Sequence, residues 1–344
     1  MLKSILQKRM DVSRKLLSRL KLTEQGIMLN GERVYISVPV KAGDMVEIRM
    51  ETEVSEDILP QPIPFEILYE DEHLLVVNKP AGLIVHPTHG HYVDTLANGV
   101  VHYWESKGES YRFRPVHRLD QETSGVLAVA KNPYAHQHIS AQMIAGTVEK
   151  RYTALVHGQP PLEHGRIDGP IDRDPAEPHR RIVTPSGYPS LTLYEVKRAY
   201  SQGSRVELKL ESGRTHQIRV HMTSIGCPLI GDRMYRHELY RGQPAAGPGE
   251  AGVETGMVTE MEPKPKTKTV QSAGFAEALA FIQALDNAMP RQALHASRLA
   301  FTHPVSRVEV CFEAPLPEDM RKLEALLAGQ AGQTGQTGQM GQTE

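Results

Sequence analysis

The sequence predicts an α+β protein with a small N-terminal domain and a larger domain built on a mostly antiparallel sheet. Predicted strands outnumber predicted helices, and short polar turns separate several of them, which favours antiparallel pairing over a doubly wound parallel sheet. The 344 residues are enough for about two domains. A stretch at 53–64 with three prolines and no apolar periodicity predicts a linker between them.

The N-terminal domain, residues 1–52, is predicted to contain two helices followed by a small sheet. Leu2, Ile5 and Leu6 form the apolar face of the first helix, and Ser13 is a plausible N-cap for the second. The Asn30-Gly31 pair predicts a two-residue hairpin turn, because both positions of such a turn need positive φ. The predicted strands of this sheet cover residues 27–29, 34–36 and 45–50.

The larger domain, residues 65–328, begins with a predicted hairpin that leads into the loop at 78–82. Pro133 fits the first turn of a helix that runs towards Ala145. The strands predicted for this domain cover residues 67–69, 74–77, 125–130, 151–156, 191–196 and 205–210.

Two stretches have little to bury. Nine of the 30 residues at 241–270 are Gly or Pro, so we expect a flexible insertion at about 237–273, followed by a docking helix with Phe275, Leu279 and Ile282 at helical spacing. The Gly- and Gln-rich tail at 329–344 is predicted to be disordered.

The overall composition is that of an ordinary soluble protein. Hydrophobic residues make up 40% and charged residues 23%, with a net charge of −2. No run of 18 apolar residues is present, and the N-terminus lacks the features of a secretory signal. Cys227 and Cys311 are too few for a disulfide framework. These features favour a cytoplasmic protein without membrane attachment.

Charge is distributed unevenly along the chain. Residues 1–22 hold seven Lys or Arg against Asp11 alone, a net charge of +6. Such a run is most often a solvated helix face, but lysines and arginines fixed on a helix can also neutralise phosphates of a nucleic acid.

Chemically versatile side chains concentrate in two segments. In the first, residues 115–125, Asp120 stands on a loop just before an apolar strand, where a lone Asp more often forms a turn. In the second, residues 211–221, Thr215 can cap a helix that ends at Gly226. Arg214 would then precede a helix N-terminus, a place that attracts anions, or would be an ordinary surface arginine.

Five segments together resemble the RluA-type pseudouridine synthases. HRLDQETSG at 117–125 and SGRTHQIRVH at 212–221 look like the two signature segments of that family. VVNKPAGLIVHP at 76–87, EKRYTALVHG at 149–158 and LHASRLAFTHP at 294–304 agree with it in the same order. The basic helices and small sheet at the N-terminus resemble the S4 RNA-binding module.

The resemblance implies an S4-like RNA-binding domain followed by a pseudouridine synthase domain, whose mixed sheet is flanked by helices. It implies that Asp120 is the catalytic carboxylate, that Arg214 is its basic partner and that Tyr152 is the active-site tyrosine. It implies no cofactor. The residues expected to bind the substrate are His117, Arg118, Lys79 and Arg219, and those expected to bind RNA on the N-terminal helices are Lys8, Arg9, Arg14, Lys15 and Arg19.

The implied substrate is structured RNA, with large-subunit (23S) ribosomal RNA first and transfer RNA second. A different class of function is an RNA-binding protein of ribosome assembly whose second domain is catalytically idle. Nothing in the sequence requires a dimer, so we expect a monomer.

Three other patterns in the sequence could indicate a functional site. His86, His89 and His91 could hold a metal, but His86 belongs to the family-like loop and no metal site is expected. His216 and His221 are five residues apart and are interpreted as structural hydrogen-bonding residues. Asp120 and Glu122 would point to opposite sides of an extended loop, which argues against a glycosidase pair.

Overall fold

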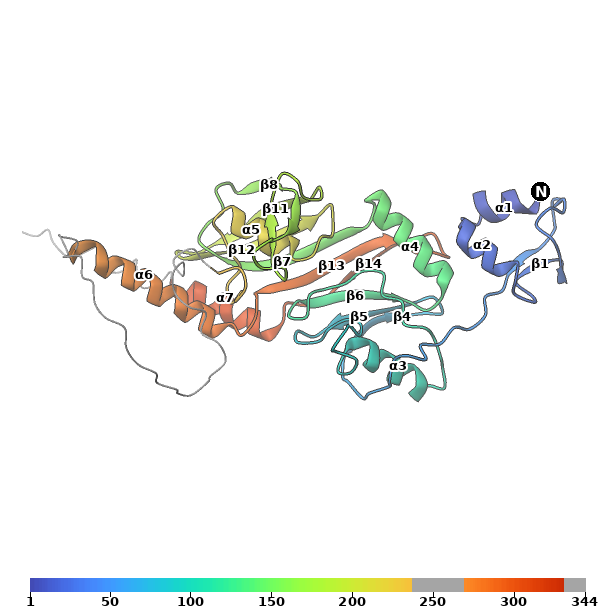
Figure 1. Ribbon diagram of the computed structural model, residues 1–344, viewed down its shortest axis with the longest axis horizontal. Coiled ribbons are helices and arrows are strands. Elements are labelled where there is room, and N and C mark those ends of the chain that lie inside the picture. Colours follow the sequence, from blue (N-terminus) through green and yellow to red (C-terminus); the bar gives the residue numbers. More distant parts are fainter. Residues whose placement is uncertain (237–268, 331–344) are drawn as a thin grey trace, which may run out of the picture.

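The computed structural model describes residues 1–236 and 269–330 of the chain (Figure 1). Its centre is a nine-stranded sheet with the order β4-β5-β6-β13-β7-β12-β11-β8, in which β14 also pairs with β13. The pair β13 and β6 is parallel, and the other neighbours are antiparallel. The predicted α+β class with a mostly antiparallel mixed sheet is therefore confirmed. The strands are β4 (Glu66–Glu70), β5 (Leu74–Lys79), β6 (Ser124–Ala130), β7 (Glu149–His157), β8 (His164–Asp168), β11 (Leu191–Ala199), β12 (Gly203–Leu210), β13 (Leu294–Thr302) and β14 (Glu309–Glu313).

Helices pack on the sheet and contribute residues to its apolar clusters. The helix α3 (Leu96–Ser106) begins at a Thr95 capping box and buries Trp104 to 1% exposure in the largest apolar cluster. The helix α4 (Pro133–Ala145) starts at the predicted Pro133, capped by Asn132. At the other end of the molecule α6 (Thr269–Ala288) and α7 (Glu318–Gln330) lie side by side in Figure 1 and share an apolar cluster that includes Leu285 and Leu323. No helix in the described part of the chain is long and apolar enough to cross a membrane.

The N-terminal residues form a separate small module beside α4 (Figure 1). It contains α1 (Leu2–Lys8), α2 (Arg14–Leu20), β1 (Ile27–Leu29), β2 (Glu32–Arg33) and β3 (Val46–Ile48). Ser13 caps α2 as predicted, by accepting a hydrogen bond from the Leu16 amide at 3.1 Å. Asn30 and Gly31 have φ values of 52° and 83°, which confirms the predicted hairpin turn.

Residues 53–64 contain neither helix nor strand, but they are not a free linker. The Glu53 carboxylate forms ion pairs with Arg19 of α2 and with Arg114 of the larger domain. Ile58 is 4% exposed and packs in the same core as Trp104. The segment was predicted as a linker from its prolines, yet it is packed on the larger domain because Ile58 supplies apolar surface there.

Several elements differ from the prediction. The elements that were not predicted are the helices α3 and α7, the strands β8, β13 and β14, and the hairpin of β9 (Ile171–Arg173) and β10 (Arg181–Val183). Of the expected flexible insertion, residues 237–268 lie outside the described residues, while 269–273 belong to α6. The expected tail begins inside α7, which extends to Gln330, and the rest of that tail also lies outside the described residues.

Gly125 lies where β6 meets β13, directly after the Asp120 loop. It pairs with Ala296 in the parallel register and has a φ of 116°. A Cβ at this position would stand 2.2 Å from the Ala296 carbonyl oxygen. Only glycine therefore lets the two strands approach at this point.

We predict that Gly125→Ala destabilises the fold by about 3 kcal/mol or more, because it adds a backbone clash to an unfavourable φ. Gly108→Ala is the matched control: its φ is 73° and no atom lies within 4 Å of the added Cβ, so it should cost only about 1 kcal/mol. Urea denaturation measures both free energies of unfolding. Equal losses for the two variants would contradict the close approach of β6 and β13.

Candidate active site

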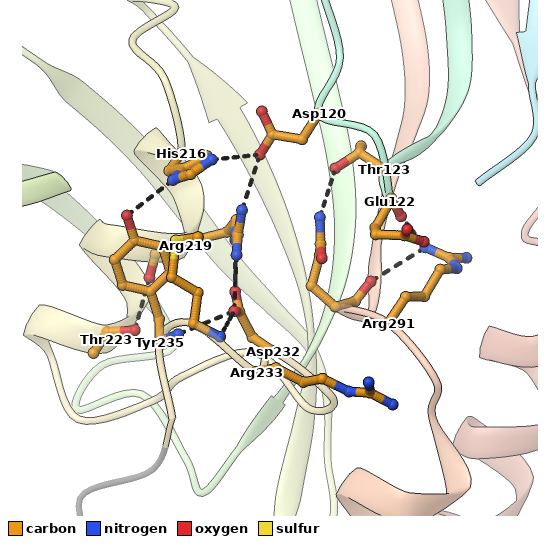
Figure 2. Close-up of polar contacts among 12 residues, drawn as sticks. Asp120, Glu122, Thr123, His216, Arg219, Thr223, Asp232, Arg233, Tyr235 and Arg291 are labelled. Atoms are coloured by element: carbon orange, nitrogen blue, oxygen red, sulfur yellow. Dashed lines mark hydrogen bonds and ion pairs between the residues drawn. The ribbon is translucent and has the colours of Figure 1, made fainter. Parts of the chain in front are cut away.

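Asp120 lies in the loop that precedes β6. Two buried basic side chains, Lys79 and Arg291, donate hydrogen bonds to the backbone of this loop. The Gln121 carbonyl accepts a hydrogen bond from Lys79 Nζ at 2.9 Å. The Glu122 carbonyl accepts one from Arg291 Nη1 at 2.9 Å. With the neighbouring carbonyls bound on that side, the Asp120 side chain points towards α5 (Gln217–Ser224), as Figure 2 shows.

The partner of the Asp120 carboxylate is Arg219 of α5. Arg219 Nη1 lies 3.4 Å from Asp120 Oδ2, and the same guanidinium donates to both oxygens of Asp232, at 2.6 Å from Nε and 2.9 Å from Nη2 (Figure 2). Asp232 in turn accepts hydrogen bonds from the amides of Met234 and Tyr235, both at 3.0 Å. Although burial disfavours the charge, the hydrogen bonds and charge of Asp232 raise the pKa of Arg219. The arginine is thus a permanent, oriented cation beside Asp120.

This geometry corrects the sequence-based assignment of Arg214 as the basic partner. Within the described residues, Arg219 is the arginine that lies within 4.0 Å of the Asp120 carboxylate. The Arg214 guanidinium stands over the Tyr188 ring, 5.1 Å from its centroid. The physical reason is the direction of the chain: Arg214 precedes α5, whereas Arg219 is carried to the Asp120 loop by the buried helix.

A cavity opens on this ion pair and contains other predicted residues. Asp120, Tyr152, Arg214 and Arg219 line it, and so does Arg118, whose side chain is exposed. Asp120 keeps 28% of its side-chain surface exposed, whereas Tyr152 is 7% exposed. Burial and the nearby negative charge of Asp120 raise the pKa of Tyr152, so its hydroxyl remains protonated.

Lys79 and His117 were predicted to bind substrate, but neither of them lines the cavity that contains Asp120. Lys79 is 0% exposed, and its ammonium donates to three backbone carbonyls, those of Pro80, Leu83 and Gln121. Burial lowers its pKa to about 7. His117 does not line the cavity. Its Nε2 lies 3.3 Å from the Val126 carbonyl, and burial lowers its pKa to about 4.

The start of α5 also differs from the prediction. Thr215 does not cap this helix; His216 stands at the N-cap with a φ of 58°. The Gln217 side chain closes the turn instead, because its Oε1 accepts from the Ser212 hydroxyl at 2.7 Å and from the Arg214 amide at 3.0 Å. His221 bonds to Thr192 and to the Gly169 carbonyl, in agreement with a structural role.

Sequence reasoning missed Asp232 and Tyr235, and it did not place His216 beside Asp120. Asp232 and Tyr235 lie in the short stretch after the second signature segment, where no pattern marked them. The usable signal is electrostatic: a helix whose residues 217–222 are all buried cannot carry an arginine without a buried carboxylate nearby. Among the described residues, no group of three His, Cys, Asp or Glu is placed to hold a metal ion.

The site combines an accessible carboxylate, a fixed guanidinium and a protonated phenol. The carboxylate can act as a nucleophile or as a base, and the guanidinium can stabilise negative charge in either case. The phenol offers a flat ring for a planar group and a hydroxyl for proton transfer.

We predict that Asp232→Asn destabilises the protein by about 3–5 kcal/mol, because it leaves the charge of Arg219 without its buried partner. The control is Asp168→Asn, which breaks a 2.7 Å pair with Arg166 whose side chains are 65% and 61% exposed and should cost less than about 1 kcal/mol. Chemical denaturation monitored by circular dichroism compares the two. If Asp232→Asn costs no more than the control, the buried pair does not order the site.

The chain resembles RNA pseudouridine synthases over most of its length. Residues 73–224 match the family model described as RNA pseudouridylate synthase, a range that includes Asp120, Tyr152 and Arg219. The chain is 35% identical over 315 residues to the uncharacterized RNA pseudouridine synthase YjbO of Bacillus subtilis, covering 91% of this chain and 95% of that protein.

Two further relatives carry the name ribosomal large subunit pseudouridine synthase D. The one from Zymomonas mobilis is 38% identical and aligns with 78% of this chain and 74% of its own length. The one from Escherichia coli O157:H7 is 34% identical, with 89% of this chain and 84% of its own length aligned.

Among solved structures, the human RNA pseudouridylate synthase domain containing 4 shares the fold. The TM-score is 0.55 at 23% sequence identity, and the match covers 76% of this chain and 93% of that chain. The family model and the sequence relatives show that the chain belongs to the RluA-type family of RNA pseudouridine synthases.

Proposed function

We propose that this enzyme converts uridines of large-subunit ribosomal RNA to pseudouridine, with Asp120 as the essential catalytic carboxylate. The observation that carries the proposal is the Asp120–Arg219–Asp232 array, which opens into a cavity beside Tyr152. The two relatives named for the large ribosomal subunit support this RNA as the substrate. Such a substrate is found in the cytoplasm, which agrees with the composition of the chain.

The reaction moves a base without a net redox change. The bond from uracil N1 to ribose C1′ breaks, a bond from C5 to C1′ forms, and the proton on C5 is replaced by one on N1. Asp120 acts either by attacking C1′ or by removing a proton from C2′. In both cases the carboxylate must reach the sugar, and the contact with Arg219 orients it.

Tyr152 is proposed to contact the uracil base. Its ring lines the same cavity as Asp120, so it can stack on an extruded uracil. Its hydroxyl stays protonated because burial raises its pKa, so it serves as a hydrogen-bond donor to the base.

The RNA contacts proposed outside the cavity are cationic. Arg118 is exposed at the rim of the cavity and can meet the phosphate backbone or fill the space beside a flipped base. Arg214, stacked on Tyr188, adds a second rim contact. The N-terminal module, with Lys8, Arg9, Arg14 and Lys15 exposed, is proposed as an S4-like RNA-binding domain. Arg19, expected in the same set, is exposed but already pairs with Glu53.

Transfer RNA as the substrate is the second candidate, with the same residues and chemistry. A catalytically idle assembly factor is the third candidate. The presence of Asp120, Arg219 and Tyr152 at one cavity argues against it, because an idle domain does not need a carboxylate positioned in an open cavity.

Three variants test the assignment of the catalytic groups on transcribed large-subunit rRNA. We predict that Asp120→Asn slows pseudouridine formation by about 100- to 10,000-fold, because it removes the charge that the reaction needs. Arg219→Gln should slow it by about 100- to 1,000-fold. Arg214→Gln should change the maximal rate by less than about tenfold, since Arg214 does not contact the carboxylate.

Mass-spectrometric counting of pseudouridine under enzyme excess gives these rates, with circular dichroism to confirm that each variant is folded. Wild-type rates in Asp120→Asn would refute the carboxylate assignment. A larger loss for Arg214→Gln than for Arg219→Gln would return the basic-partner role to Arg214. No product with rRNA, but product with transcribed transfer RNA, would select the second candidate substrate.

The RNA-binding role of the N-terminal module is tested in the full chain by Lys8→Gln, Arg14→Gln and Lys15→Gln combined. We predict weaker RNA binding and a plot of log affinity against log salt that is less steep by about two to three, because each phosphate contact releases counterions. The matched control changes Lys197, Arg321 and Lys322 to Gln, three basic residues of the larger domain. Equal salt slopes for both triple variants would exclude the module as the RNA-binding element.

A further inference from the structure

His216 lies between the catalytic carboxylate and a buried tyrosine. Its Nε2 is 4.0 Å from Asp120 Oδ2, and its Nδ1 is 2.9 Å from the Tyr235 hydroxyl (Figure 2). The ring meets the Tyr235 ring edge to face, with centroids 5.6 Å apart. His216 also lines the cavity that contains Asp120 and Tyr152. The histidine is therefore connected to the reaction centre on one side and to the protein interior on the other.

The hydrogen bonds of Tyr235 determine which nitrogen of His216 carries the proton. The Tyr235 oxygen accepts a hydrogen bond from the Arg181 amide of β10 at 2.7 Å. Tyr235 is 2% exposed, so its own hydroxyl proton must be donated within the protein. Within the described residues, His216 Nδ1, 2.9 Å away, is the atom available to accept it. A neutral histidine that accepts at Nδ1 carries its proton on Nε2, which is the nitrogen that faces Asp120.

The environment keeps the ring neutral. Burial lowers the pKa of His216, and the cationic Arg219 and Arg181 lower it further, while Asp120 and Asp232 oppose them. The guanidinium groups of Arg219 and Arg180 both contact the Tyr235 ring, at 4.9 Å and 5.6 Å from its centroid. The hydroxyl that donates to His216 is thus fixed in place before RNA binds.

We propose that His216 is a positioning residue for Asp120: its neutral Nε2–H tautomer, set by Tyr235, provides a second donor to the oxygen that Arg219 already contacts. The catalytic part of this inference rests on the proposed function. At 4.0 Å the contact is longer than a hydrogen bond, and contacts of this kind commonly shorten when the substrate is bound. Arg219 and His216 both approach Oδ2, and within the described residues no hydrogen bond involves Oδ1. The geometry therefore assigns Oδ1 as the oxygen that faces the ribose.

Three substitutions separate positioning from a purely structural role. His216→Asn tolerates the observed φ of 58°, but its shorter side chain does not reach Asp120. His216→Gln places an amide N–H near the original Nε2. Tyr235→Phe leaves the ring and removes the hydroxyl that selects the tautomer. His221→Asn, on the same helix but bonded to Thr192 and Gly169, is the matched control.

Single-turnover pseudouridine formation on transcribed large-subunit rRNA measures the effect. We expect His216→Asn to lower the maximal rate about 10- to 100-fold, with little change in the RNA concentration for half-maximal rate, because a misplaced reacting group costs rate. His216→Gln should recover most of this loss, and Tyr235→Phe should fall between the two. His221→Asn should lower the melting temperature without this selective loss of rate.

Nitrogen-15 NMR of histidine-labelled protein tests the tautomer without RNA, and the signal missing in His216→Gln identifies His216. The expected spectrum shows a proton on Nε2, and Tyr235→Phe should weaken that preference. A proton on Nδ1 in the wild type would overturn the inference, as would a rate for His216→Asn within about twofold of wild type or equal losses for Asn and Gln. Wild-type protein that modifies neither rRNA nor transfer RNA would instead refute the proposed function, and the NMR result would still decide the tautomer.

Discussion

The site depends on one interaction, the fork between Arg219 and Asp232. An arginine that is 6% exposed is costly unless its charge and its donors are satisfied. Asp232 neutralises the charge and accepts two of the N–H donors, from a side chain with no exposed surface. One nitrogen, Nη1, remains for Asp120. Because Asp232 itself is anchored by backbone amides, the position of the Asp120 carboxylate is determined through Arg219 by a buried side chain outside the cavity.

The sheet brings these groups together from distant parts of the chain. Asp120 precedes β6, Tyr152 lies on β7, and Arg219 lies on α5, while β13 stands between β6 and β7 and joins the two halves. The junction is tight, since Gly125 and Ala296 leave no room for a side chain. Lys79 and Arg291 then fix the Asp120 loop against this junction by donating to its carbonyls. These bonds restrict the loop, and a positioned carboxylate requires such restriction.

The sequence was sufficient for the fold class and for the elements with strong local signals. It also singled out Asp120 and Tyr152, which the structure brings to one cavity. The predictions based on Ser13, Asn30 and Pro133 are confirmed. Helix caps, turns and first-turn prolines act on the neighbouring backbone, so the local sequence is enough to predict them. The expected roles of Arg214 and Lys79 did not hold because they depend on where the fold carries each side chain: Arg214 precedes α5 and lies over the Tyr188 ring, whereas Lys79 is buried. A lysine in a polar loop looks like a phosphate contact until the fold shows it inside, bonded to three carbonyls.

The N-terminal module is attached in a way that suits binding better than chemistry. It contacts α4 through few polar groups: the Tyr134 hydroxyl donates to the Met10 carbonyl at 2.8 Å, and the Ser13 amide donates to Gln137 at 3.0 Å. Figure 1 shows it beyond the end of the large sheet, beside α4 and apart from α5. Extracting a uridine from its stack costs a few kcal/mol, and contacts made far from the reacting bond can offset that cost. A basic module fixed at a distance from the cavity can do so without disturbing the Asp120 array.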